Sequence, residues 1–159
     1  VGSLLHLDAI GPDPQRLDAQ LFEVMLSPHP SGMMVLAAPN RPAETRAPDP
    51  AVVMKLLDLA VSRFDYVVID LPRTWFAWTD AVVSGSNKVF VVTETTVPGL
   101  KLASNLSNAM VAKLGDELKP RVIVNRFEQK MFGSGLKRSD LEAALKEKFA
   151  GTVSNNYRL

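Results

Sequence analysis

The chain has 159 residues, of which 47% are hydrophobic and 22% charged, which fits an ordinary globular domain large enough to bury a core. The net charge of +1 argues against a chain-wide field that attracts nucleic acid or an acidic membrane. There is no cysteine, which excludes disulfides, thiolate metal sites and a cysteine nucleophile, and no apolar stretch approaches the roughly 18 residues of a membrane-spanning helix.

The start of the chain carries neither an initiator methionine nor a basic signal-peptide region. We therefore expect Val1 to be an internal residue of a longer protein. A helix is expected after Pro14, because Leu17, Leu21, Val24 and Met25 recur at helical spacing.

Apolar runs of strand length follow one another along the rest of the chain. They lie at 33–37, 66–69, 89–92, 122–124 and, more weakly, 152–153. None alternates polar with apolar residues, so we expect each strand to be covered on both faces, as in a parallel sheet flanked by helices.

Segments of helical period separate these runs. One begins at the Asp49-Pro50 cap, a shorter one covers 77–83, another spans 102–114 before Gly115, and a capping box at 139–142 opens a last helix that runs to about Phe149. The alternation predicts an α/β fold with a doubly wound, mostly parallel sheet, and residues 1–159 read as a single domain.

Polar side chains stand at the carboxyl ends of three expected strands. They are Asp70, Thr93 and Asn125. Ligands of doubly wound sheets bind at that edge, so we predict one shared site.

Asp70 closes the apolar run 66–69 and is followed by Pro72, which ends the strand. A carboxylate fixed there suits Mg²⁺, which keeps several waters and needs few protein ligands. The alternative is an aspartate that caps a helix or bonds its own loop, and the residues alone leave the choice open.

Two further strand ends allow two interpretations each. Glu94 can orient a water or a neighbouring arginine, although a solvated loop is the simpler interpretation. Asn125, followed by Arg126, can both donate to and accept from an adenine edge, or it can tie the backbone of its loop.

Trp75 and Trp78 lie three residues apart just after Asp70, where they could form a partner surface or pack on the domain's own sheet. The loop 129–138 is basic with one aromatic, which suggests phosphate, DNA or lipid contact or simple solvation. Its Gly133-Ser134-Gly135-Leu136-Lys137 does not have the spacing of a phosphate-binding loop.

The quoted residues resemble a known family over essentially the whole chain. Asp65 to Pro72 is similar to the switch II and Walker B segment of the MinD/ParA deviant-Walker ATPases. Pro72 to Thr79 looks like the Pro-x-x-Trp-x-x-Trp-Thr stretch of the TadZ/CpaE pilus-assembly proteins. Val122 to Arg126 resembles that family's Val-Leu-Asn-Arg strand end, and 154–158 stands where the family has an adenine-side turn.

The resemblance implies a P-loop NTPase-like fold and a bacterial cytoplasmic factor, at the inner membrane or cell pole, that helps place a Flp/Tad type IV pilus machine. It also implies a homodimer, pilus and secretion assembly proteins as partners, peripheral membrane association, and a receiver-like domain upstream.

For the site, the resemblance implies ATP or ADP with Mg²⁺, and Asp70 as the catalytic residue that holds the metal through water. Arg126, Asn125, Asn155 and Asn156 would bind the nucleotide, with the three asparagines near adenine. Trp75 and Trp78 would lie beside the dimer face.

The sequence also departs from the family pattern. The phosphate loop, its signature lysine and the switch I aspartate are absent from this chain, and Ser154 replaces the usual proline. Weak ATP hydrolysis is therefore implied by the resemblance alone, and a non-catalytic scaffold is the alternative. A ParA-like partitioning ATPase that binds DNA is more remote, because the net charge is only +1.

Overall fold

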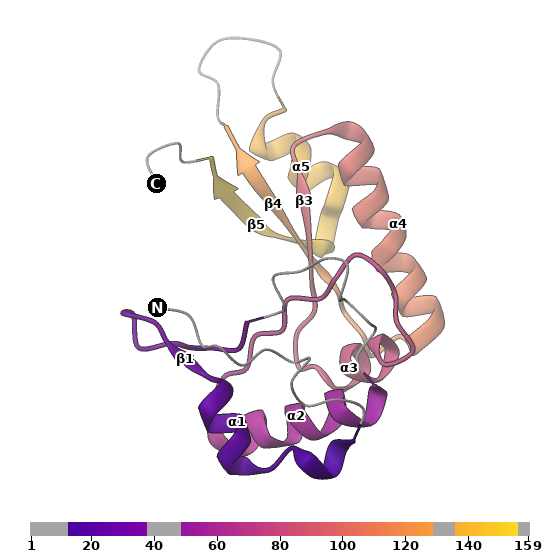
Figure 1. Cartoon of the computed structure of the whole chain (residues 1–159). Helices are drawn as coiled ribbons and strands as arrows, with labels where there is room; N and C mark the ends of the chain where they lie inside the picture. Colours follow the sequence, from indigo (N-terminus) through magenta and orange to yellow (C-terminus); the bar gives the residue numbers. More distant parts are fainter. Residues whose placement is uncertain (1–12, 38–48, 129–135, 156–159) are drawn as a thin grey trace. The chain divides into compact units, whose positions relative to one another are not determined.

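The computed structural model describes residues 13–37, 49–128 and 136–155 (Figure 1). The chain divides into two compact units, one up to Val82 and one from Val83 onward. That both belong to one ATPase-like domain stays a prediction.

The first unit is built on two helices. Helix α1 is Ala19–Met25, preceded by the 3-10 turn η2, Pro14–Arg16, and helix α2 is Pro50–Arg63. The carboxylates of Asp18 and Asp49 cap α1 and α2 by accepting the backbone N–H of Leu21 at 2.7 Å and of Ala51 at 2.8 Å. A small core joins the two helices and consists of Leu17, Phe22, Met25, Val52 and Ala60.

The prediction of a parallel strand at 33–37 is wrong. Only Met34–Val35 forms a strand, β2, and it pairs antiparallel with β1, Ser27–Pro28. The chain turns back between them at Gly32, whose φ of 87° favours glycine, and His29 donates its backbone N–H to the carbonyl of Met33 at 2.8 Å. A tight hairpin replaces the predicted crossover connection.

The buried strand predicted at 66–69 is also not formed. The segment is neither helix nor strand, and Tyr66 and Val68 are 91% and 93% exposed. A strand needs a hydrogen-bonding neighbour, and no strand of the described residues pairs with this segment. Its apolar side chains are therefore presented to solvent.

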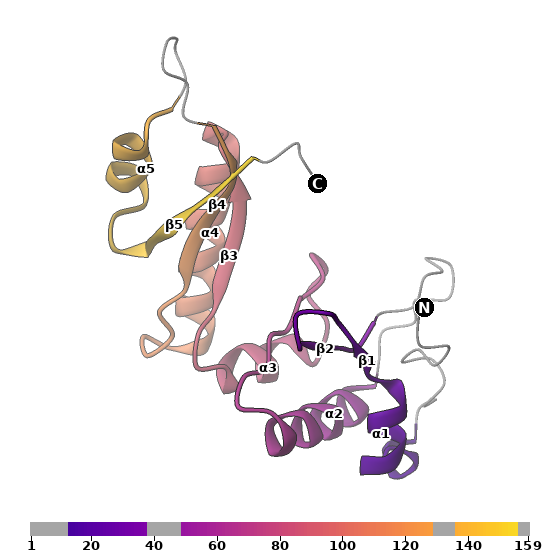
Figure 2. The same cartoon turned by 90° about the vertical axis from the view of Figure 1, so that its left-hand side faces the viewer.

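The second unit holds a parallel sheet. Its strands are β3, Phe90–Glu94, β4, Arg121–Phe127, and β5, Phe149–Ser154, arranged in the order β3-β4-β5 (Figure 2). Each overlaps a predicted apolar run, and both pairings are parallel. The predicted α/β fold class, with a parallel sheet flanked by helices, is confirmed.

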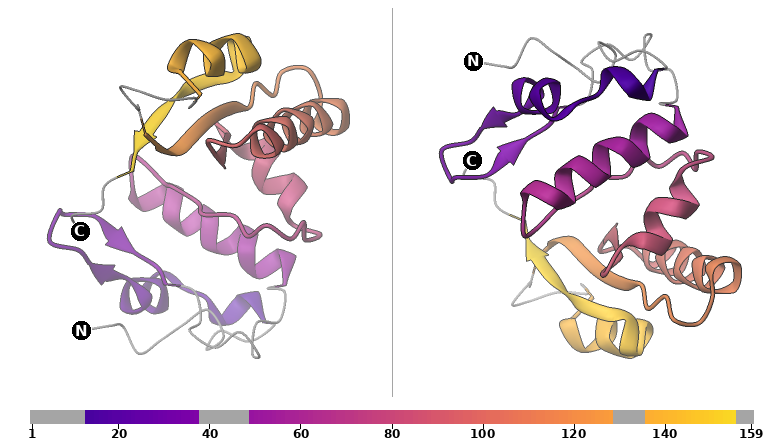
Figure 3. Two further views of the ribbon diagram at one scale, coloured as in Figure 1. Left: turned by 90° about the horizontal axis from the view of Figure 1, so that it is seen from above. Right: turned by 90° about the horizontal axis from the view of Figure 1, so that it is seen from below.

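Helices α4, Val97–Leu114, and α5, Arg138–Leu145, contact each other and the sheet (Figure 3). Helix α4 ends at Gly115, as predicted. Helix α5 begins one residue earlier than the predicted capping box, because the Asp140 carboxylate accepts the backbone N–H of Lys137 at 2.8 Å. It also ends sooner, and the 3-10 turn Lys146–Lys148 leads into β5. Helix α3, Thr79–Gly85, spans the boundary between the units.

The two faces of this sheet differ. Val91, Val122 and Val124 share one face and are buried. On the opposite face Phe90 and Val92 are 48% and 62% exposed. The expectation that each strand is covered on both faces is therefore not met at β3.

Candidate functional site

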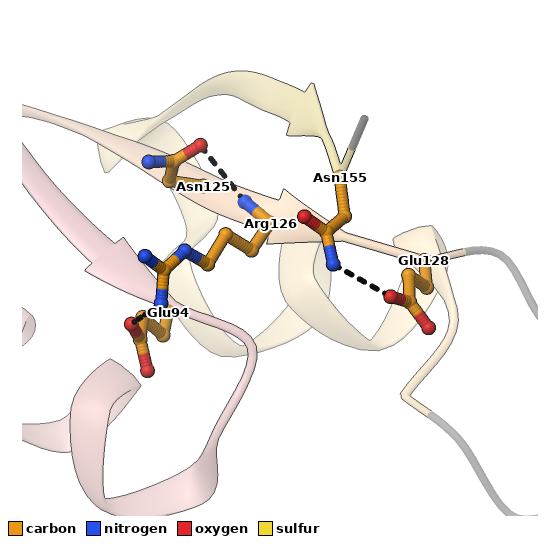
Figure 4. Close-up of polar contacts among 5 residues, drawn as sticks. All are labelled: Glu94, Asn125, Arg126, Glu128 and Asn155. Atoms are coloured by element: carbon orange, nitrogen blue, oxygen red, sulfur yellow. Dashed lines mark hydrogen bonds and ion pairs between the residues drawn. The ribbon is translucent and has the colours of Figure 1, made fainter. Parts of the chain in front are cut away.

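The carboxyl ends of β3, β4 and β5 gather polar side chains (Figure 4). Glu94 is the last residue of β3 and stands in register with Asn125 on β4, and Asn155 follows directly after β5. Because parallel strands end at one edge, residues far apart in the sequence meet here.

An irregularity in β4 sets the direction of Arg126. The pairing of β4 with β5 shifts register between Val124 and Phe127, and Arg126 has φ of 54°, in the left-handed region. Such bulges redirect side chains at the ends of strands. The Arg126 guanidinium reaches across to β3, where its Nη1 lies 3.0 Å from Glu94 Oε1. Glu94 thus orients a neighbouring arginine, which is one of the interpretations that the sequence allows.

Asn125 is half-buried and bonds the backbone. Its Oδ1 accepts the backbone N–H of Arg126 at 2.9 Å. The loop-tying alternative is therefore observed. It occupies only the amide oxygen, so the Nδ2 group keeps its capacity to donate, and recognition of adenine stays a prediction.

Both the side chain and the backbone of Asn155 form hydrogen bonds. Its Nδ2 donates to Glu128 Oε1 at 2.7 Å, and its backbone N–H donates to the carbonyl of Phe127 at 3.2 Å. Sequence reasoning missed Glu128, since its partner lies 27 positions away and no local motif marks it. Asn156 lies outside the described residues.

Asp70 belongs to the first unit and is exposed, directly after the segment 66–69. Its place beside Asn125 in one shared site stays a prediction. In the part of the chain that the structure describes, no three histidine or acidic side chains cluster so as to hold a metal. A water-mediated Mg²⁺ contact needs only one carboxylate, and that role of Asp70 stays a prediction.

The two tryptophans have different surroundings. Trp78 is 8% exposed and its ring stacks on Phe76, with 5.5 Å between ring centroids. Trp75 is 39% exposed, and its indole Nε1 donates to Asp80 Oδ1 at 2.8 Å. The packing alternative describes Trp78, whereas Trp75 is exposed. A dimer face at either residue stays a prediction.

None of the helices in the described ranges combines the length and the apolar character needed to cross a bilayer. Most of the basic loop 129–138 lies outside the described residues, so its contact with phosphate, DNA or lipid stays a prediction.

The parallel sheet and its flanking helices form an α/β fold of the type found in MinD/ParA ATPases. Two solved structures are similar to the chain. The ParA family ATPase from Chlorobium tepidum TLS has 17% identity and a TM-score of 0.77 over 98% of this chain and 63% of its own. The MinD cell division protein of Aquifex aeolicus has 21% identity and a TM-score of 0.69 over 100% of this chain and 62% of its own.

The chain thus spans less than two thirds of the length of either structure. At these identities the likeness shows the fold alone. No protein-family model matches the chain, and no curated protein matches it.

Proposed function

We propose that the protein is a nucleotide-responsive factor that binds the adenine base of ATP or ADP at the carboxyl ends of β4 and β5. The observation that carries the proposal is the pair of amides at these ends. Asn125 and Asn155 are both half-buried, and each has one amide atom bonded to a protein group, whereas the other amide atom has no bond to any of the described residues.

The described residues fit a base better than they fit phosphates. Amide groups supply the neutral donors and acceptors that a base edge requires. The printed sequence holds no glycine-rich phosphate loop, so we derive no phosphoryl-transfer step. Arg126 adds a cation at the same edge, and Asp70 is our proposed ligand for Mg²⁺ through water.

The biological role that we propose is placement of a Flp/Tad type IV pilus machine by a homodimer. The support is the resemblance of Pro72 to Thr79 to the TadZ/CpaE proteins, together with the exposed Trp75 in that stretch. Pilus and secretion assembly proteins are the proposed partners, with peripheral association at the inner membrane or cell pole. A non-catalytic scaffold of the same fold is the second candidate.

Asn125→Asp tests nucleotide binding. Aspartate keeps an oxygen to accept the Arg126 N–H but removes the Nδ2 donor, so the structural bond survives and the ligand bond does not. We expect adenine-nucleotide affinity to fall roughly tenfold, about 1.4 kcal/mol, with an unchanged melting temperature. Equilibrium titration of the full-length protein with ATP and Mg²⁺ measures this effect.

Two results would count against the proposal. If the wild-type protein binds no adenine nucleotide, the scaffold is the better description. If Asn125→Asp binds as tightly as the wild type, Asn125 only ties its loop. Asp70→Ala is the separate test of the metal, because it is expected to remove the Mg²⁺ dependence of binding and to spare the fold, Asp70 being exposed.

A further inference from the structure

We propose that Glu128 is a positioning residue that locks the amide of Asn155 and thereby makes the site select adenine over guanine. The inference rests on the proposed function and deepens it. It starts from the two bonds drawn at the ends of β4 and β5 in Figure 4.

The chemistry of the partners fixes which way each amide points. A backbone N–H only donates, so the Asn125 atom 2.9 Å from the Arg126 nitrogen must be the oxygen. A carboxylate only accepts, so the Asn155 atom 2.7 Å from Glu128 Oε1 must be the NH₂ nitrogen. Turning either amide over would place two donors or two oxygens against each other.

The two amides therefore offer opposite groups to a ligand. Asn125 presents its NH₂ as a donor, and Asn155 presents its carbonyl oxygen as an acceptor. Adenine carries a matching pair on one edge, because N7 accepts and the N6 amino group donates. Guanine carries two acceptors there, N7 and O6, so O6 would face the Asn155 oxygen without a proton between them. A site built this way rejects guanine by leaving polar atoms unpaired.

Glu128 is required for this discrimination because an unrestrained amide can turn over. With Glu128 removed, Asn155 can present its NH₂ group to O6 as readily as its oxygen to N6. The backbone bond from Asn155 to Phe127 is independent of Glu128 and keeps the segment in place. Glu128 is exposed, so its replacement leaves no cavity in the core.

The test compares affinities for ADP and GDP, measured by equilibrium titration of the full-length protein. We expect the wild type to prefer ADP at least tenfold, and Glu128→Ala to bring the ratio to within about threefold of unity. Glu128→Gln is expected to lose most of the preference as well, since the glutamine amide can itself turn over and either accept from the Asn155 NH₂ group or donate to the Asn155 oxygen. Glu128→Lys donates instead, which turns the amide over and is expected to favour GDP.

Glu142→Ala is the matched control, since Glu142 is an exposed acidic residue of the same unit whose partner is Arg138. The Glu142→Ala variant should have the same ADP/GDP affinity ratio as the wild type. The melting temperature should be unchanged in all four variants. An unaltered ratio in Glu128→Ala overturns the positioning role while nucleotide binding stands. A wild-type protein that binds neither nucleotide refutes the proposed function itself.

Discussion

Arg126 has a backbone conformation that residues other than glycine rarely adopt. Its φ of 54° lies in the left-handed region, where Cβ crowds the following carbonyl. Among the described residues its side chain pairs with Glu94, in an exposed ion pair with side chains 67% and 61% accessible, which contributes little to stability. The strained conformation at the strand end therefore has a cost that this ion pair does not offset.

Two substitutions of Arg126 distinguish the energetic cost of the strained backbone from the contribution of the ion pair with Glu94. Arg126→Ala and Arg126→Gly both remove the pair, but only glycine relieves the left-handed backbone. We expect the glycine variant to be more stable than the alanine variant by about 1 kcal/mol in urea denaturation. Arg121, whose φ is not positive, is the control, and there alanine should be the more stable of the two. If the glycine and alanine variants have the same order of stability at both positions, the backbone of Arg126 is not strained.

At the site, the sequence located the strand ends but not the contacts between them. The position of Asn125 at a strand end marks it as a candidate, whereas Asn155 is implied by the family resemblance alone. Glu128 could not be found, because its bond to Asn155 depends on how β4 and β5 are aligned and on the chain that connects them. Glu94 and Arg126 lie 32 positions apart, and their contact depends in addition on the irregularity in β4.

Among the elements, helices were predicted better than strands. A helix satisfies its own backbone, so its capping residues and periodicity specify it locally, as at α2 and α4. A strand needs a neighbour. The apolar runs within β3, β4 and β5 pair with one another, whereas the similarly apolar run 66–69 pairs with no strand among the described residues. Apolar runs report the tendency to pair but not the presence of a partner.

The start of α4 packs closely against the end of β3, and Gly99 allows that approach. A Cβ at this position would lie 2.8 Å from Thr96 Oγ1 and 2.9 Å from Thr93 Oγ1. Thr96 is the capping residue, and its Oγ1 accepts the Gly99 N–H at 3.1 Å. The same hydroxyl would therefore have to move.

Gly99→Ala is expected to lower the free energy of unfolding by about 1–2 kcal/mol, through loss of the cap and local crowding. Thermal unfolding followed by circular dichroism measures the change. Gly85→Ala, at the last residue of α3 with no atom within 4 Å of the added Cβ, is the control and should be neutral or slightly stabilising. Equal effects of the two substitutions would exclude crowding as the cause.

Over the whole molecule, apolar side chains are exposed in both units. The first presents Tyr66 and Val68, and the second presents Phe90 and Val92 on the open face of β3. In the described sheet β3 pairs only with β4, so its other edge carries unpaired backbone groups. An apolar edge strand of this kind is a template for association with further chains.

Val92→Lys tests this expectation on the 159-residue chain. Val92 is 62% exposed, so a lysine there stays solvated and opposes edge pairing at little cost to the fold. Sedimentation velocity should show less concentration-dependent association than in the wild type, with a similar melting temperature. Val91, the adjacent residue on the covered face, is 8% exposed, and Val91→Lys should destabilise the second unit by more than about 3 kcal/mol because it buries an unpaired charge. Undiminished association of the Val92→Lys variant would show that β3 is not the surface through which the chains meet.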